Sequence, residues 1–281
     1  MIPAFLALLA GFLFALAVHM QRKGLDHMGD RKGAFVTLAT MAAMFWLVAP
    51  FIIERAWWST EAALAFAICG LFFPAFSQRL AVISVAQTGP AVSSALGAFA
   101  PLFAALPAVL ILGERLTVQT ALGMALMIGG LVASAVGTPG NRRNWPLWAV
   151  FLPLGASFIR GVVQPVTKNW MDTADMAFFS VLVMTSVSTM VAGLILVAAK
   201  NRQTRENERR GYPWFGLNGV FIGLGVLALQ YAVALGDIVV AAPLASTTPL
   251  WALALGWLVF RRERLGIRQL VMALLVVAGT I

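Results

Sequence analysis

The chain has 281 residues, of which 60% are hydrophobic and 11% charged, and its formal net charge is +9. Soluble domains average about 45–50% apolar and about 25% charged residues, so this composition excludes a soluble globular protein. The charges lie in short clusters between apolar stretches of about 20 residues, the length that crosses a bilayer core. The basic excess therefore indicates membrane orientation and argues against nucleic-acid binding, which would gather basic residues on one face.

Hydropathy divides the chain into ten apolar segments. The first lacks a preceding basic region and a small-residue cleavage site, so we expect a retained span and no signal peptide. Helices are expected because in lipid only helices and closed barrels satisfy the backbone, and the alternation of barrel strands is missing. The two longest connections, 21–32 and 200–212, leave no room for an inserted soluble domain. The predicted spans are 3–20, 33–53, 62–86, 90–112, 118–137, 146–166, 175–199, 213–234, 239–260 and 267–281.

Two blocks of sequence, about 150 residues apart, resemble each other. Pro101 lies in an apolar segment that is followed by Glu114-Arg115-Leu116, and Pro249 lies in one that is followed by Glu263-Arg264-Leu265. A repeat of this period gives two halves, 1–140 and 141–281, with five spans each. Because five is odd, the halves would cross the membrane in opposite directions. The sequence thus predicts an all-α integral membrane fold of two inverted five-helix repeats.

Lysine and arginine are distributed unequally between alternate loops. One set of loops holds 15 of them and the other set holds only Arg55, Arg115 and Lys168. Cytoplasmic loops carry the basic excess in membrane proteins. The first set is therefore expected in the cytoplasm and both chain ends outside.

Two arginines lie inside predicted spans, where an ionisable side chain is costly and therefore a candidate for function. Arg79 follows Gln78 in the third span, and Arg160 lies in the sixth span with Gln164 four residues on, on the same helical face. A guanidinium binds a carboxylate or phosphate through two parallel hydrogen bonds. We expect one or both arginines to hold an anionic group of a solute, with Arg79 the leading candidate. The alternative is that each reaches the headgroups or a helix-end carbonyl.

All eleven acidic residues fall in loops or at span ends, so no mid-membrane carboxylate is expected to bind a cation or carry a proton. This pattern argues against a cation/proton antiporter. Glu114 and Glu263 each precede a new helix, where an acid complements the positive helix N-terminus and Thr117 can cap, so a structural role is expected. His19 ends the first span and is a candidate titrating group, although a histidine in this position is more often simply interfacial.

Prolines interrupt four spans, at Pro74, Pro101, Pro165 and Pro249, because a mid-helix proline frees a carbonyl and bends the axis. Polar side chains close to these sites are candidates for solute binding. Besides Arg79, Gln78, Arg160, Gln164 and His19, these candidates are Ser93, Ser94, Gln230, Tyr231, Thr247, Thr248 and Trp251. No cofactor or metal is expected, since His19 and His27 alone cannot supply a zinc site. The single cysteine, Cys69, is interpreted as a packing residue.

These proline–glutamate blocks resemble the drug/metabolite transporter superfamily, in its ten-helix EamA-type branch. Ser77-Gln78-Arg79-Leu80 followed by Gly89 is similar to the segment before the proline helix of that family. The resemblance implies two inverted five-helix repeats, a central cavity lined by spans 1–4 and 6–9, and alternating access for amino acids and other metabolites. Two features depart from the family. Arg262 stands where a direct count from the first block would place the acid, and the family's termini are usually cytoplasmic.

The sequence therefore predicts a secondary transporter for a small organic metabolite, an amino acid or an organic anion, and not an enzyme. Its expected partners are this solute and the lipid bilayer of a bacterial inner membrane, with no nucleic acid; a homodimer stays open. Two alternatives remain. A lipid-acting membrane enzyme would have to use Asp172/Asp175 or His27/Asp30, which look like ordinary loop charges. A non-transporting receptor or assembly subunit would be expected to carry the long terminal or inserted domains of signalling proteins, which this sequence lacks.

Overall fold

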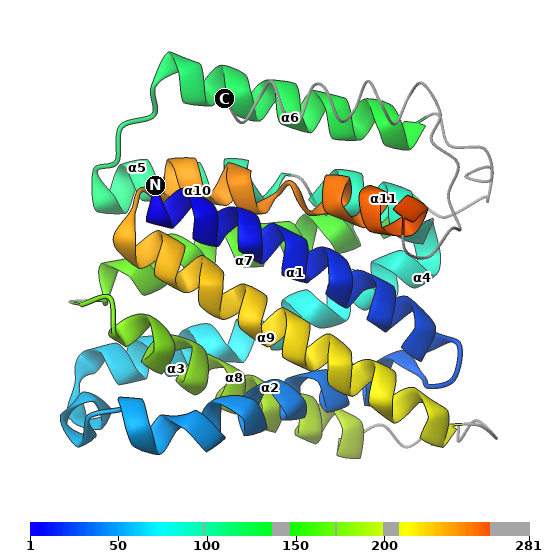
Figure 1. Cartoon of the computed structure of the whole chain (residues 1–281), viewed down its shortest axis with the longest axis horizontal. Helices are drawn as coiled ribbons and strands as arrows, with labels where there is room; N and C mark the ends of the chain where they lie inside the picture. The colour runs from blue at the N-terminus through cyan, green and yellow to red at the C-terminus, as the bar shows by residue number, and fades with distance from the viewer. Residues whose placement is uncertain (98, 137–146, 172, 199–207, 259–281) are drawn as a thin grey trace.

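The computed structural model describes residues 1–97, 99–136, 147–171, 173–198 and 208–258, which form helices and short connections with no strand among them (Figure 1). The α-helices are α1 (Ile2–Leu25), α2 (Asp30–Ile52), α3 (Glu61–Phe72), α4 (Ala75–Gly97), α5 (Ala100–Leu112), α6 (Val118–Val136), α7 (Phe151–Asn169), α8 (Met176–Ala198), α9 (Tyr212–Leu235), α10 (Ile238–Ala245) and α11 (Thr248–Leu258). Three short 3₁₀ helices are η1 (Arg55–Ser59), η2 (Leu147–Val150) and η3 (Glu208–Gly211).

Within these residues, seven helices or helix pairs are long and apolar enough to cross a membrane. Two shorter apolar helices lie at Ala100–Leu112 and Val118–Gly130. The tenth predicted span, 267–281, lies outside the described residues. Large apolar side chains are exposed along several helices, for example Leu47 at 76% and Leu110 at 74%. Such surfaces would drive aggregation in water, but they suit contact with lipid tails.

The third and fourth predicted spans divide differently in the structure. They form three helices, and the expected connection at 87–89 lies inside α4, which continues to Gly97. The chain breaks instead at Phe73–Pro74, between α3 and α4. Pro74 has no N–H, so the carbonyl of Gly70 lacks its helical donor. Ser188 of α8 replaces it, because its hydroxyl donates to Gly70 O at 2.6 Å and accepts from Ala75 N at 3.2 Å.

We expect Ser188→Ala to lower the stability of the folded protein. The substitution leaves a buried carbonyl and a buried N–H without partners, and each such group costs about 1–3 kcal/mol. Thermal unfolding in detergent measures the effect. Thr189→Val is the matched control, because the Thr189 hydroxyl donates to Thr185 O within its own helix, at 2.7 Å. Equal melting temperatures for the two variants would contradict this account of the break.

The two repeat prolines occupy equivalent places. Pro101 is the second residue of α5 and Pro249 the second residue of α11, so each begins a new helix after a break in the chain. Proline fits the first turn of a helix, where its missing N–H has no partner to lose. The predicted interruptions at these two prolines are therefore confirmed, as is that at Pro74. The predicted interruption at Pro165 is wrong, because α7 continues through Pro165. This proline lies about one turn before the helix ends at Asn169.

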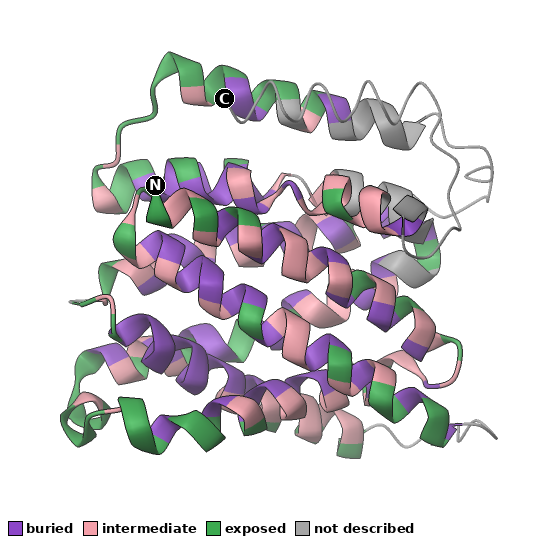
Figure 2. Ribbon diagram, viewed as in Figure 1, coloured by how far each residue is buried: buried purple, intermediate pink, exposed green. Residues whose placement is uncertain are grey.

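The helices pack closely around α1 and α9. α1 lies along α9, as Figure 1 shows, and buried residues are most numerous in α8 and α9 (Figure 2). Small residues permit this contact: a side chain at Gly225 of α9 would meet the ring of Phe14 of α1 at 2.7 Å. Gly219 likewise lies against Thr37 O of α2, a close approach that small residues allow between membrane helices. Cys69 is buried in a cluster with Phe66 and Phe179.

The two ends of the helices form two different faces. The face where α1 begins, called here the N-terminal face, brings Pro3 against Gly236 and joins Lys168 to Glu114. At the other face α1 ends and α2 begins, with only residues 26–29 between them, a shorter connection than the predicted 21–32. This basic face carries Arg22, Lys23, Arg31, Lys32, Arg209 and Arg210. Because α1 begins and α7 ends at the N-terminal face, these two helices run in opposite directions.

Candidate functional site

A cavity of about 240 Å³ lies among α1, α4, α5, α7, α9, α10 and α11. The helix breaks found above contribute to it, since Pro74, Pro101 and Pro249 all line its wall. Its other walls are largely apolar. The cavity reaches Arg22 and Leu25 in the last turn of α1, and therefore extends toward the basic face.

Arg160 and Gln164 lie one turn apart on α7 and both line the cavity. Arg160 is half-buried, whereas Gln164 is only 8% exposed. The side-chain oxygen of Gln164 is buried without a hydrogen-bond partner. Buried polar groups are almost always paired, so an unpaired acceptor beside a cavity is a candidate to accept a hydrogen bond from a bound molecule.

Two further glutamines contribute amides to the wall. Gln230 of α9 donates through Nε2 to Thr167 Oγ1 at 3.3 Å and to Ser180 Oγ at 3.1 Å, which fixes its position. Gln78 of α4 donates to Gln21 Oε1 of α1 at 3.3 Å. The cavity thus combines apolar walls with several hydrogen-bonding groups, as small-molecule sites do.

The charge of the cavity has one sign. Among the described residues that line it, Arg22 and Arg160 are charged and none is acidic. Arg22 is exposed at the mouth and Arg160 lies deeper along α7. A cleft lined by one sign of charge in low-dielectric walls concentrates ions of the opposite sign.

The cavity brings together half of the residues that the sequence predicted for the site. The residues that line it are Gln78, Ser93, Arg160, Gln164, Gln230 and Thr248. Arg79 is not among the lining residues, because the neighbour of Gln78 on a helix turns about 100° away from it. The side chain of Ser94 lies outside the described ones.

The other four predicted residues are not on the described wall of the cavity. His19 is within 2.9 Å of Ala252 O through Nε2, and Thr247 donates to Leu244 O at 2.7 Å. Tyr231 packs against the core of α2, α8 and α9. The Trp251 ring packs edge-on against the Phe12 ring, with their centroids 5.5 Å apart.

Sequence reasoning missed Gln21, Arg22 and Ser157, which also line the cavity. Hydropathy ends the first span at 20 and so places Gln21 and Arg22 in a loop, whereas α1 continues to Leu25. Phe14, Val18 and Gln21 are spaced so that they share one face of a helix. This periodicity is the sequence signal that could have placed Gln21 on the first helix.

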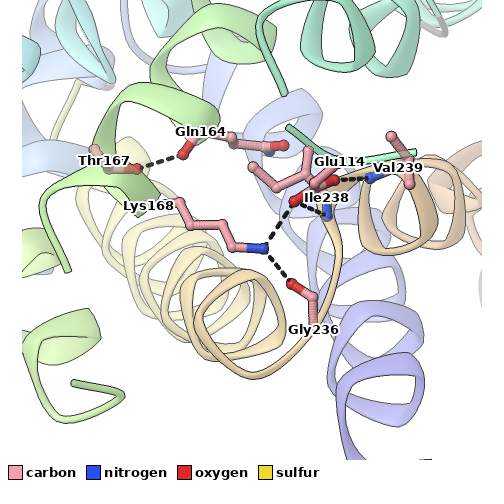
Figure 3. A network of polar contacts seen from close by, with 7 residues as sticks. All are labelled: Glu114, Gln164, Thr167, Lys168, Gly236, Ile238 and Val239. Carbon is pink, nitrogen blue, oxygen red and sulfur yellow. Dashed lines mark hydrogen bonds and ion pairs between the residues drawn. The ribbon is translucent and has the colours of Figure 1, made fainter. Parts of the chain in front are cut away.

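A second polar cluster joins helix ends at the N-terminal face (Figure 3). Glu114, between α5 and α6, accepts from the backbone N–H groups of Ile238 and Val239 at 3.0 Å each. Lys168 of α7 donates to Glu114 Oε1 at 2.8 Å and to Gly236 O at 2.7 Å. The structural role predicted for Glu114 is confirmed, although the helix whose N-terminus it complements is α10 and not α6. Thr117 accepts from Thr120 N at 3.2 Å and so caps α6, as predicted, while Glu263 lies outside the described residues.

Comparisons with known proteins identify the chain's family. The sequence profile described as the EamA-like transporter family matches twice, over residues 1–136 and 147–281. The chain belongs to the EamA-like transporter family. The resemblance seen in the sequence is thus confirmed, and the protein is a multi-pass membrane protein of the drug/metabolite transporter type.

A solved structure described as "Crystal structure of protein" is similar with a TM-score of 0.75 and 14% identity. The match covers 99% of this chain and 94% of that one, and at this identity it shows a shared fold alone. No curated protein sequence matches the chain.

Proposed function

We propose that this EamA-family protein is a secondary transporter that carries a small organic metabolite with an anionic group, such as an amino acid or an organic anion, by alternating access. The observation that carries the proposal is the cavity with Arg160 on its wall and no acidic residue among its described lining residues. A guanidinium in an apolar wall is positioned to bind a carboxylate or phosphate through two charge-assisted hydrogen bonds. Gln164 and Gln230 supply amides for the rest of the solute.

Two inverted five-helix repeats would suit this role. The two profile matches, 1–136 and 147–281, and the opposite directions of α1 and α7 support that division. Transporter sites commonly lie where such repeats meet, at helices broken near the middle of the bilayer. The cavity has this character, because the breaks before Pro101 and Pro249 meet on its wall.

The basic face is assigned to the cytoplasm, because cytoplasmic loops of membrane proteins carry the excess of lysine and arginine. The cavity in this structure extends to that face, so the state described is the one open to the cytoplasm under this assignment. An impermeant reagent applied to a tag at the N-terminus tests the orientation; labelling of intact cells supports it, and labelling only after lysis contradicts it.

A thermal-shift screen of the detergent-solubilised protein tests the proposed solute class. A ligand at 100 times its Kd stabilises the folded protein by about 2.7 kcal/mol, which raises the melting temperature measurably. We expect shifts from small carboxylates or amino acids and none from organic cations of similar size. Equal shifts from cations would contradict the anion assignment.

A further inference from the structure

The cluster around Glu114 is unusual because it is a nearly buried ion pair at the end of a helix bundle. The Glu114 side chain is 6% exposed and the Lys168 side chain 21% exposed. Each of the two charges has further partners, in Ile238 N and Val239 N for the carboxylate and Gly236 O for the ammonium. Buried charges with this many partners hold their elements in one arrangement, since removing any partner leaves a charge uncompensated.

The pair connects the two parts of the chain that match the family profile. Glu114 belongs to the first matched segment, whereas Lys168 and the connection between α9 and α10 belong to the second. The pair joins the C-terminal ends of α5, α7 and α9 to the N-terminal end of α10 (Figure 3). A motion of one repeat against the other would have to separate these groups.

A second cavity, of about 400 Å³, lies at the N-terminal face beside this pair. Its described lining includes Glu114, Lys168, Asn169, Thr173 and Asp237, and it shares no lining residue with the first cavity. α7 passes along both, with Arg160 and Gln164 on the first and Lys168 on the second. Residues 160, 164 and 168 repeat every four positions, so they lie along one stripe of the helix.

We propose that the polar cavity at the N-terminal face is the second mouth of the transport pathway, and that the Glu114–Lys168 pair is the gate that closes it. The inference rests on the proposed transport function. In the state described here, the first cavity extends to the basic face while the gate holds α5, α7 and α10 together at the other. Separation of Glu114 from Lys168 opens the pathway to the N-terminal face.

The unpaired side-chain oxygen of Gln164 supplies a hydrogen-bond acceptor for the Lys168 ammonium when the gate is open. It lies one turn before Lys168 on the same stripe of α7 and lacks a hydrogen bond here. A lysine has a flexible four-carbon side chain, so Lys168 can turn from Glu114 toward this acceptor. The gate therefore has a partner for its charge in both states, and its opening does not leave a bare ammonium in the bilayer.

Accessibility of a single cysteine tests the gate. Val163 lines the first cavity, so Val163→Cys in a Cys69→Ala background is the reporter, in liposomes with the N-terminal face outward. With the pair intact, an impermeant maleimide added outside labels the reporter slowly. We expect Glu114→Gln or Lys168→Gln to raise that rate at least tenfold, and Lys168→Arg to leave it near the parent rate.

The matched control is Glu208→Gln, which breaks the Lys32–Glu208 pair of 2.7 Å on the basic face. It should not raise labelling from the N-terminal face. Unchanged labelling in both gate variants, with gel filtration showing folded protein, would overturn the proposal, as would an equal rise in the control. Labelling that rises in gate variants without any solute flux would support the gate and contradict the transport function instead.

A measurement without substitutions covers the case in which the variants do not fold. Hydrogen exchange of the Ile238 and Val239 amides in the unmodified protein reports opening directly, because both N–H groups bond to Glu114. A gate predicts exchange clearly faster than that of the buried amides of α9. Exchange as slow as in that core would contradict it.

Discussion

Arg160→Ala is expected to weaken binding of the anionic solute by about 10- to 100-fold. Hydrogen bonds to charged groups contribute about 1.5–3 kcal/mol, and each 1.4 kcal/mol is a tenfold change in affinity. Arg160→Lys should recover part of the loss, since an ammonium keeps the charge but not the planar pair of donors. Titration calorimetry with a carboxylate found in the thermal-shift screen measures the three affinities.

Arg79→Ala is the comparison that decides between the two arginines. Arg79 lies outside the described cavity wall, so its removal should change the affinity less than threefold. Loss of binding in Arg79→Ala with normal binding in Arg160→Ala would contradict the geometry and restore the assignment made from sequence.

Gly161→Ala is expected to destabilise the protein by about 1–3 kcal/mol, the usual range for overpacking a close contact. A Cβ at this position of α7 would lie 2.7 Å from Ala100 O, 2.7 Å from Phe103 Cβ and 2.9 Å from Ala104 N. Backbone atoms of α5 cannot turn aside as a side chain can, so the two helices must separate. Chemical or thermal unfolding in detergent measures the loss of stability. The solute affinity should fall as well, because the shift of α7 would displace the adjacent Arg160.

Gly155→Ala is the control on the same helix. A Cβ there would meet only Leu80 Cδ1, at an ordinary 3.4 Å. Alanine is also favoured over glycine inside a helix by about 0.5–1 kcal/mol. This variant should be as stable as the parent or slightly more so. Equal destabilisation by the two substitutions would show that the α5–α7 contact is looser than described.

Much of the architecture follows from the sequence because apolar length and proline leave few alternatives. The predicted breaks at Pro74, Pro101 and Pro249 are present, and the structural role of Glu114 is found as well. The partner of Glu114 could not be predicted, since α10 lies more than 120 residues away along the chain. A helix N-terminus accepts any acid that the fold brings to it.

Which residues line the cavity depends on helical phase, which hydropathy does not report. In a continuously apolar span every face has the same hydropathy, so the sequence predicts both Arg79 and Gln78 as site residues. Adjacent helical residues diverge by about 100°, and only Gln78 lines the cavity. The sequence misses Gln21 for a related reason. Hydropathy falls at this polar residue and ends the predicted span, whereas the helix α1 continues past it to Leu25.

Solute counterflow in proteoliposomes tests the central claim most directly. Vesicles loaded with an unlabelled carboxylate that binds the protein are diluted into a trace of the same labelled compound. The account predicts transient accumulation of label in vesicles with the unmodified protein, and little in vesicles with Arg160→Ala or without protein. Binding of the carboxylate without accumulation of label would contradict it.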